Sequence, residues 1–165
     1  MGSAYNERHA QCEKAARALG VPALRDVSIG DLERRVGELD ATTRRRARHV
    51  VTENARTLEA AQAMQAGDPR RLGELMNASH ESLRADFEVS SRELDIMVEK
   101  ARPLDGCIGA RMTGAGFGGC AVALVESAAA TSFSERVAVD YAAATDLTPE
   151  IHVCTASAGA ELLEP

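Results

Sequence analysis

The sequence predicts an α+β fold, in which a helical first half with a helix hairpin packs on a small, mainly antiparallel sheet from the second half. Apolar residues recur at helical spacing as far as about residue 101, and β character begins after Pro103. Aromatic residues make up only 3% of the 165 residues and there is no Trp. The core is therefore expected to consist of Ala, Leu and Val, which suits close-packed helices. This length predicts a single domain over residues 1–165.

The first half contains five predicted helical segments, at about residues 4–19, 29–39, 42–66, 68–84 and 90–101. Gly20 ends the first segment, and Asp40 is expected to cap the third. Gly67 closes the third helix, and Pro69 opens the fourth at a position where its missing N–H is harmless. Ser90 begins a Ser-x-x-Glu capping box for the fifth. The very short turn at Gly67 predicts an antiparallel helix hairpin.

The second half is predicted to form a β-loop-β-α-β unit. Its parts are strands at 106–113 and 119–125, a Gly loop at 114–118, a helix at 127–144 and a strand at 150–155. The run from Cys120 to Val125 has little polar interruption, which predicts a strand that is central or covered on both faces. In the last strand, Ile151 and Val153 alternate with polar residues. From Ala156 the chain is weakly patterned.

Composition excludes several classes of function. The net charge of −6 provides no basic face for nucleic acid. No run of 18 apolar residues predicts a membrane span, and the first residues lack the apolar region of a signal peptide. The start Met1-Gly2-Ser3 is either native or was added in cloning. We therefore expect a cytoplasmic protein with neither a nucleic-acid nor a membrane partner.

The cysteines and histidines do not predict a metal site. The four cysteines have no C-x-x-C spacing, so they are expected to be reduced thiols and not a disulfide framework or zinc site: Cys12, Cys107, Cys120 and Cys154. His49, His80 and His152 share no ligand spacing, although His49 could pair with Glu53 one helical turn later. We expect structural or surface histidines and no metal ligand.

Two groups of basic and polar residues leave alternatives open. The arginines at 44, 45, 46 and 48 lie in the first turns of a helix, where cations oppose the helix dipole. They form either a solvated face with local acidic partners such as Glu38 and Asp40, or a contact to an anion or another domain. Arg111 is either paired with a buried carboxylate or a pocket residue. Thr113 could donate its hydroxyl to a neighbouring loop.

The stretch Gly109–Val125 is the strongest functional signal in the chain. Glycine lets the backbone adopt positive φ, and exposed successive N–H groups can form an anion-binding nest. Gly114 to Gly119 formally fits G-x-G-x-x-G, but the dinucleotide fingerprint needs a helix after the glycines and a strand follows here. No Gly-Lys-Ser/Thr is present, so a Walker loop is excluded as well. What remains is a strand–loop–strand with an unusually open backbone.

Gly109-Ala-Arg-Met-Thr-Gly-Ala-Gly-Phe-Gly-Gly-Cys120 closely resembles the third signature motif of the galactokinase family, within the GHMP small-molecule kinase superfamily. Further segments resemble the C-terminal half of that family in the right order: Tyr5–Arg8, Gln11–Glu13, Arg46–Asn54, Ser79–Arg84 and Phe87–Ser90. The similarity spans nearly the whole chain. It implies the C-terminal GHMP domain, of ferredoxin-like type.

The resemblance implies a two-lobed enzyme that phosphorylates the anomeric hydroxyl of galactose with Mg²⁺ and ATP, giving galactose 1-phosphate. Tyr5 matches the tyrosine that contacts the sugar. The third-motif loop, which braces the phosphate-binding loop of the other lobe and helps to close the sugar pocket, matches Gly114, Ala115, Gly116, Phe117, Gly118 and Gly119. Arg111 and Thr113 are expected to support this loop.

The family's sugar-binding first motif, its ATP loop and its catalytic Asp do not occur in residues 1–165. We therefore expect no catalytic residue in this chain, no tightly bound cofactor, inactivity alone, and a missing N-terminal lobe as partner. Self-association through the exposed lobe interface is a further expectation. The alternative is a stand-alone binding or regulatory module that holds a small metabolite with its Gly loop. Whether the chain is truncated or a short natural gene stays open.

Four positions depart from the family pattern within the matched region. Ala85 and Phe87 stand in the family's Asp-Asp-Tyr, and Ser91 and Arg92 replace its Cys-Pro. The first pair removes a carboxylate and a hydroxyl. Their effect on activity is an open question at this point, as is the preferred sugar.

Overall fold

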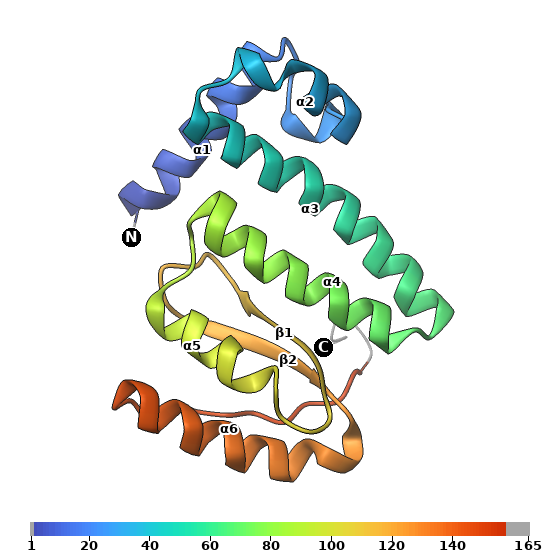
Figure 1. The fold of residues 1–165 in the computed structure, drawn as a ribbon, viewed down its shortest axis with the longest axis vertical. Coiled ribbons are helices and arrows are strands. Elements are labelled where there is room, and N and C mark those ends of the chain that lie inside the picture. Colours follow the sequence, from blue (N-terminus) through green and yellow to red (C-terminus); the bar gives the residue numbers. More distant parts are fainter. Residues whose placement is uncertain (1, 158–165) are drawn as a thin grey trace, which may run out of the picture.

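Helices and one β-hairpin are stacked in layers in the computed structural model, which describes residues 2–157 (Figure 1). The helices of this part are α1 (Gly2–Ala18), α2 (Ile29–Arg35), α3 (Ala41–Ala66), α4 (Pro69–Ser82), α5 (Arg92–Ala101) and α6 (Ala130–Thr145). The strands are β1 (Cys107–Thr113) and β2 (Cys120–Val125). From α1 and α2 the layers run through α3, α4 and the hairpin to α5 and α6. The predicted α+β class is confirmed.

The capping signals of the first half are where the sequence predicts them. The Asp40 side chain accepts the N–H of Thr43 at the start of α3. Gly67 ends α3 with a left-handed φ of 64°, and the Asp68 side chain accepts the N–H of Arg71 in front of α4. Since only this short turn separates α3 and α4, the two helices pack as the predicted antiparallel hairpin.

Two predictions about helix ends need correction. Ser91, and not Ser90, caps α5, because the Ser90 hydroxyl instead donates to the Asp95 carboxylate at 2.6 Å. The fourth helix stops at Ser82 and continues as a π-helical turn, Leu83–Phe87, up to a left-handed residue. That residue is Glu88, with φ 55° and ψ 50°.

The sheet is smaller than predicted. Within residues 2–157 it has two antiparallel strands, and both begin one residue later than expected because Gly106 and Gly119 have positive φ. The expectation that β2 is central or covered on both faces is wrong, since Val122 is 46% exposed.

The predicted strand at 150–155 is not formed. The segment carries no strand assignment, and Val153 is 65% exposed. Its alternating pattern suits a strand, but a strand also needs a hydrogen-bonded neighbour. The described residues pair no strand with this segment. The weakly patterned tail lies largely outside the described residues.

Small residues bring α4 directly onto β1. A Cβ on Gly73 would lie 2.1 Å from the carbonyl oxygen of Ile108, and a Cβ on Gly109 would lie 2.5 Å from the Cα of Gly73. Two other side chains of α4 satisfy the N–H groups of β1: Asn77 Oδ1 accepts from Ala110 at 3.0 Å, and His80 Nδ1 accepts from Met112 at 3.2 Å. A helix thus covers what would otherwise be an open strand edge.

Three apolar clusters form the core. One lies among α1, α2 and α3 and contains Leu19, Leu32 and Val51. A second lies between the sheet and α5 and α6, with Val98 and Phe133 at its centre. The third joins the segment after α4 to α5 and β1 and contains Leu83, Val89, Leu94 and Met112. The third cluster lies beneath the Gly loop, because the partly buried Phe117 packs against it.

Candidate functional site

The Gly loop connects β1 to β2 at the tip of the hairpin. Five of its six residues have positive φ: Gly114, Gly116, Phe117, Gly118 and Gly119. Phe117 has φ 60°, which is rare for a bulky side chain and costs conformational energy. Such strain persists only where neighbouring contacts hold the backbone in place.

The contacts that hold the loop come from Val89. The Phe117 N–H donates to the carbonyl oxygen of Val89 at 2.7 Å. Gly116 lies so close that a Cβ there would be 2.2 Å from the same oxygen. Together with its φ of 82°, this close approach requires glycine at position 116. One side of the loop is therefore fixed on the segment that follows α4.

The other side of the loop is open. A Cβ added at Gly114, Gly118 or Gly119 would meet nothing within 4 Å among the described atoms. Thr113 and Ala115 are exposed, and within residues 2–157 the Thr113 hydroxyl makes no hydrogen bond. Another backbone or an anion therefore has room to approach the loop closely, as the glycine content predicts.

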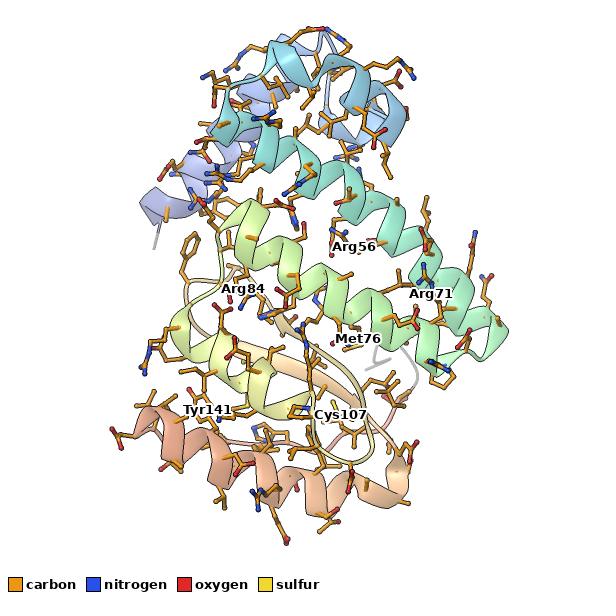
Figure 2. All side chains as sticks on the ribbon, viewed as in Figure 1. Arg56, Arg71, Met76, Arg84, Cys107 and Tyr141 are labelled. Carbon is orange, nitrogen blue, oxygen red and sulfur yellow. The ribbon has the colours of Figure 1, made fainter. Side chains whose placement is uncertain are left out.

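Arg111, on the strand that leads into the loop, forms an ion pair with a carboxylate. It is half-buried, its Nη1 lies 3.6 Å from Oε1 of Glu53, and its Nε donates to the Met112 carbonyl at 3.0 Å. The first of the two sequence alternatives for Arg111, a carboxylate partner, is thus realised. Glu53 also accepts from Ser79 at 2.5 Å and from Arg56 at 2.8 Å, and Arg56 lies between α3 and α4 (Figure 2).

These donors set the protonation of Glu53. Burial would raise the pKa of the carboxyl, but the hydrogen bonds from Ser79 and Arg56 bring the pKa below its usual value. Glu53 is therefore ionised at neutral pH, and it links β1 to both helices of the hairpin.

Polar side chains of α3 and α4 meet between the two helices and form a polar seam, which contains Glu53, Ser79, Ser82 and His49. The Nδ1 of His49 is 3.0 Å from the Ser82 hydroxyl, and its ring stacks on Phe87 at 4.4 Å between centroids. Burial lowers the pKa of His49 to about 4. The predicted pair of His49 with Glu53 is not a direct contact, because Glu53 bonds to Ser79, Arg56 and Arg111 instead.

Of the other histidines named in the sequence analysis, His80 is a structural group and His152 is a surface group. His80 is buried, accepts from Met112 at Nδ1 and places Nε2 3.3 Å from Asp95, and burial lowers its pKa. Its Nε2 therefore carries the proton and lies beside the Asp95 carboxylate. His152 is exposed beside Glu150. No group of three or more His, Cys, Asp or Glu side chains within the described part of the chain is placed to hold a metal.

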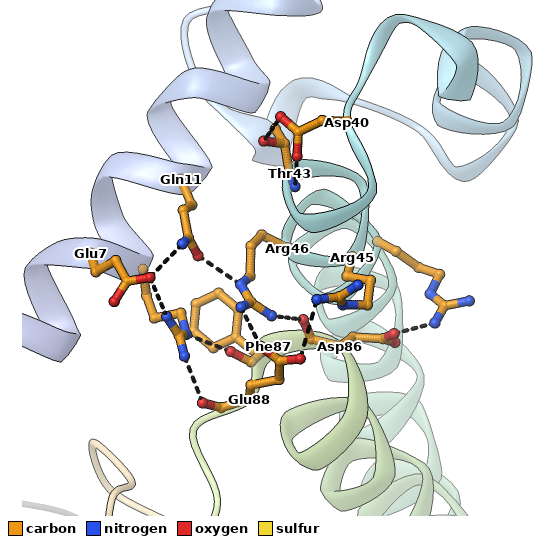
Figure 3. A network of polar contacts seen from close by, with 11 residues as sticks. Glu7, Gln11, Asp40, Thr43, Arg45, Arg46, Asp86, Phe87 and Glu88 are labelled. Carbon is orange, nitrogen blue, oxygen red and sulfur yellow. Dashed lines mark hydrogen bonds and ion pairs between the residues drawn. The ribbon is translucent and has the colours of Figure 1, made fainter.

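Three of the four arginines at the start of α3, at 45, 46 and 48, bind a distant segment and not the local carboxylates expected from the sequence, and Arg44 is exposed. Arg46 is 2% exposed and donates to the Asp86 carbonyl at 2.5 Å and to the Glu88 carboxylate at 2.5 Å. Arg45 pairs with Glu88 as well, and Arg48 pairs with Asp86 (Figure 3). This network holds the π-helical turn and Glu88 against α1 and α3.

Tyr5 lies on α1 and is 60% exposed, so its ring is free to contact another molecule. The helix that carries it is connected to the loop through Arg8, whose guanidinium lies 5.9 Å from the Phe117 ring centroid. Sequence reasoning missed the roles of Arg8, Arg46 and Val89. All three occur within quoted family segments, but nothing in those segments indicates their partners.

The four departures from the family pattern fit their local positions. Ala85 is exposed, and the Phe87 ring packs on His49. Ser91 caps α5, and Arg92 is the exposed first residue of that helix. The hydrogen-bonded Asp86 between them is buried. At these positions Ala85 and Arg92 are thus exposed, whereas Phe87 and Ser91 make specific contacts.

Two hollows of about 90 and 530 Å³ lie in the region of α1, α2 and α3. Neither is lined by a residue of the Gly loop. Gly114, Gly118 and Gly119 instead form an open surface of the described chain.

Comparisons with known proteins agree with this geometry. The family model for the C-terminal part of GHMP kinases matches residues 60–142. The chain is 49% identical over 162 residues to a galactokinase of Roseiflexus sp. and 50% identical over 159 residues to one of Actinobacillus succinogenes. These matches cover 95% and 94% of this chain but 41% of each relative. The chain thus spans about two fifths of the length of these relatives.

A solved structure shows the same fold. The galactokinase of Lactococcus lactis, crystallised with galactose, superposes with a TM-score of 0.85 at 40% sequence identity. The match covers 88% of this chain and 39% of that one. No helix among residues 2–157 is long and apolar enough to cross a membrane. Together, the family model and the galactokinase matches show that the chain belongs to the GHMP kinase family and corresponds to the C-terminal part of its galactokinase members.

Proposed function

We propose that this chain is the C-terminal lobe of a sugar kinase that transfers the γ-phosphoryl group of ATP to the anomeric hydroxyl of galactose. The Gly loop carries the proposal. Its backbone is fixed on one side by Val89 and open on the other at Gly114, Gly118 and Gly119. This arrangement suits the close approach of a second backbone, the phosphate-binding loop of an N-terminal lobe.

In this proposal Tyr5 contacts the sugar, and Arg111 and Thr113 support the loop. The exposure of Tyr5 and the pairing of Arg111 with Glu53 are consistent with these roles. Residues 114–119 would exclude water and position the neighbouring lobe. Positioning is the main contribution that a protein makes to phosphoryl transfer.

The donors present here do not fit a magnesium site. Mg²⁺ in kinases is held by carboxylates and phosphate oxygens, and no cluster of such ligands occurs within residues 2–157. The open loop has room beside an ATP phosphate, but it offers only backbone groups. We therefore ascribe the Mg²⁺ and ATP ligands to the complete enzyme and derive no step through them. By itself the chain is expected to be inactive.

A chimera tests the proposal. The C-terminal part of the Roseiflexus galactokinase would be replaced by this chain, and galactose-dependent ATP consumption would be measured. We expect turnover within about tenfold of the parent, because the two sequences are 49% identical over the exchanged part. A second chimera with the corresponding part of the Actinobacillus galactokinase is the matched control.

An inactive chimera beside an active control would contradict the proposal, provided that both are folded. Tight binding of galactose or phosphate by the isolated chain would favour the alternative, a stand-alone module. The single-domain organisation and self-association also stay predictions. Self-association predicts a sedimentation coefficient that rises with concentration.

A further inference from the structure

Four consecutive carbonyl groups, those of residues 86–89, lie at the end of the π-helical turn and directly after it, and each accepts a hydrogen bond from another part of the chain. The Asp86 carbonyl accepts from Arg46, and the Phe87 and Glu88 carbonyls accept from Arg8. The fourth, that of Val89, accepts from the Phe117 N–H of the Gly loop. The loop is thus held by the last carbonyl of a row whose first three are held by arginines.

Arg8 holds the middle of this row. Its Nε lies 2.7 Å from the Phe87 oxygen and its Nη2 lies 3.0 Å from the Glu88 oxygen. The side chain is only 12% exposed. Its Nη1 is 3.3 Å from the exposed carboxylate of Glu7. A planar guanidinium can bind two successive carbonyls in this way, whereas a lysine ammonium is a single point charge.

The peptide that Arg8 binds is in a strained conformation. Glu88 has φ 55°, and its carbonyl accepts from Arg8 on α1. The next carbonyl in the chain is that of Val89. Phe117, at the other end of the contact, has φ 60°. Non-glycine residues in this region persist only where the surroundings hold them. Arg8 supplies this restraint at Glu88, and its guanidinium also lies over the Phe117 ring at 5.9 Å.

The same residue lies next to Tyr5 on α1. Residues three apart on a helix share a face, so Tyr5 and Arg8 point the same way from α1. The network in Figure 3 fixes this face of α1 through Gln11, whose Oε1 accepts from Arg46 at 2.7 Å.

We propose that Arg8 is a positioning residue, which sets the Gly loop relative to the helix that carries Tyr5 by holding the Phe87 and Glu88 carbonyls. Without it, the row of carbonyls loses its middle support and the loop separates from Val89 more often. The expected effect of Arg8 on sugar binding rests on the proposed function. The mechanical connection itself concerns residues of this chain alone.

Amide hydrogen exchange of the 165-residue chain tests the connection directly. In R8Q, exchange of the Phe117 amide is expected to rise about tenfold, because two bonds from a charged donor are lost next to the Val89 carbonyl that accepts the Phe117 N–H. R8K is expected to fall between R8Q and the wild type. The matched control is R17Q on the same helix, since Arg17 is exposed and its guanidinium lies 3.7 Å from the Glu13 carboxylate of the same helix. R17Q is expected to leave Phe117 unchanged.

Two results would overturn the proposal. In the first, R8Q folds and exchanges Phe117 at the wild-type rate. In the second, R8Q accelerates the amide of Val98, in the core between α5 and α6, as much as that of Phe117. That second pattern would mean that Arg8 supports the whole fold and not the loop.

Kinetics of the Roseiflexus chimera extend the test to the sugar. R8Q is expected to raise KM for galactose about tenfold with kcat changed less than about threefold, because a misplaced Tyr5 and loop weaken sugar binding. A purely structural defect would lower the active fraction, and hence kcat, without changing KM, and would count against a positioning role. If the wild-type chimera is inactive, the proposed function fails, whereas the exchange measurement still decides the role of Arg8.

Discussion

The two faces of α4 contact their neighbours by different physical means. Toward β1, Gly73 brings the helix backbone against the strand, and Asn77 and His80 bind the strand N–H groups. Toward α3, Ser79 donates to Glu53 and Ser82 lies against His49. At Gly73 the first contact depends on the absence of a side chain. The second depends on every polar group having its partner and its usual charge.

This difference indicates how each face fails. The backbone contact at Gly73 involves no titratable group, but it does not tolerate an added methyl group, because buried backbone cannot move aside cheaply. A buried polar seam tolerates small changes of volume, but loses stability when one partner is removed or when a neutral group gains a charge. The Gly loop lies at the end of both faces, since β1 leads into it and the segment after α4 holds it.

Adding a methyl group to the backbone contact is expected to have the largest effect. G73A places a Cβ 2.1 Å from the Ile108 oxygen and should lower the free energy of unfolding by about 3 kcal/mol. Urea denaturation measures this change. The control is G37A, because a Cβ there meets nothing within 4 Å and Gly37 does not have positive φ. Equal stability of G73A and G37A would show that α4 can move away from β1.

Removing one member of the seam comes next. E53A leaves Ser79 and Arg111 without their carboxylate partner and should cost about 2 kcal/mol. E59A on the same helix is the matched control, because Glu59 pairs with Arg71 at the exposed surface. Surface pairs contribute about 0–1 kcal/mol. If both variants lose the same stability in urea, the seam is no more important than a surface pair.

Charging the seam has a smaller effect and a defined direction. The folded-state pKa of His49, about 4, is lower than the ordinary value of 6.5, so the unfolded chain binds the proton more readily. The stability contribution is present above pH 6.5 and is lost as the pH falls toward 4. Between pH 6.5 and 5 we expect a loss of roughly 1–2 kcal/mol. H49Q should flatten this part of the urea-derived pH profile, whereas H152Q at the exposed surface should not change it.

The smallest effect is expected at position 85, which lies on neither of the two faces of α4. Ala85 is exposed on the π-helical turn, so A85D, which restores the family's carboxylate, should change stability by less than about 0.5 kcal/mol. Thermal unfolding measures it. A loss above about 1 kcal/mol would mean that position 85 contacts the seam.

Local signals in the sequence predicted the elements better than their packing. Asp40, Gly67 and Asp68 act through the turn on which they lie, so their roles were readable without neighbours. Ser90 fits the Ser-x-x-Glu pattern through Glu93, but Ser91 is the N-cap of α5, because the Ser90 hydroxyl donates to the Asp95 carboxylate instead. The strand at 150–155 was predicted from alternation alone, but pairing decides whether a strand forms.

By itself the sequence determined the helix hairpin, the strand–loop–strand and the open backbone of residues 114–119, because each follows from local spacing and from glycine. Only the tertiary structure decided which groups hold that loop. Arg8 and Phe87 are 79 residues apart in the chain, and Arg46 and Glu88 are 42 apart. Partners at such separations are set by which elements pack together, and an arginine's local sequence is the same whether it is solvated or buried. The loop can therefore be predicted from the sequence, whereas its attachment to α1 cannot.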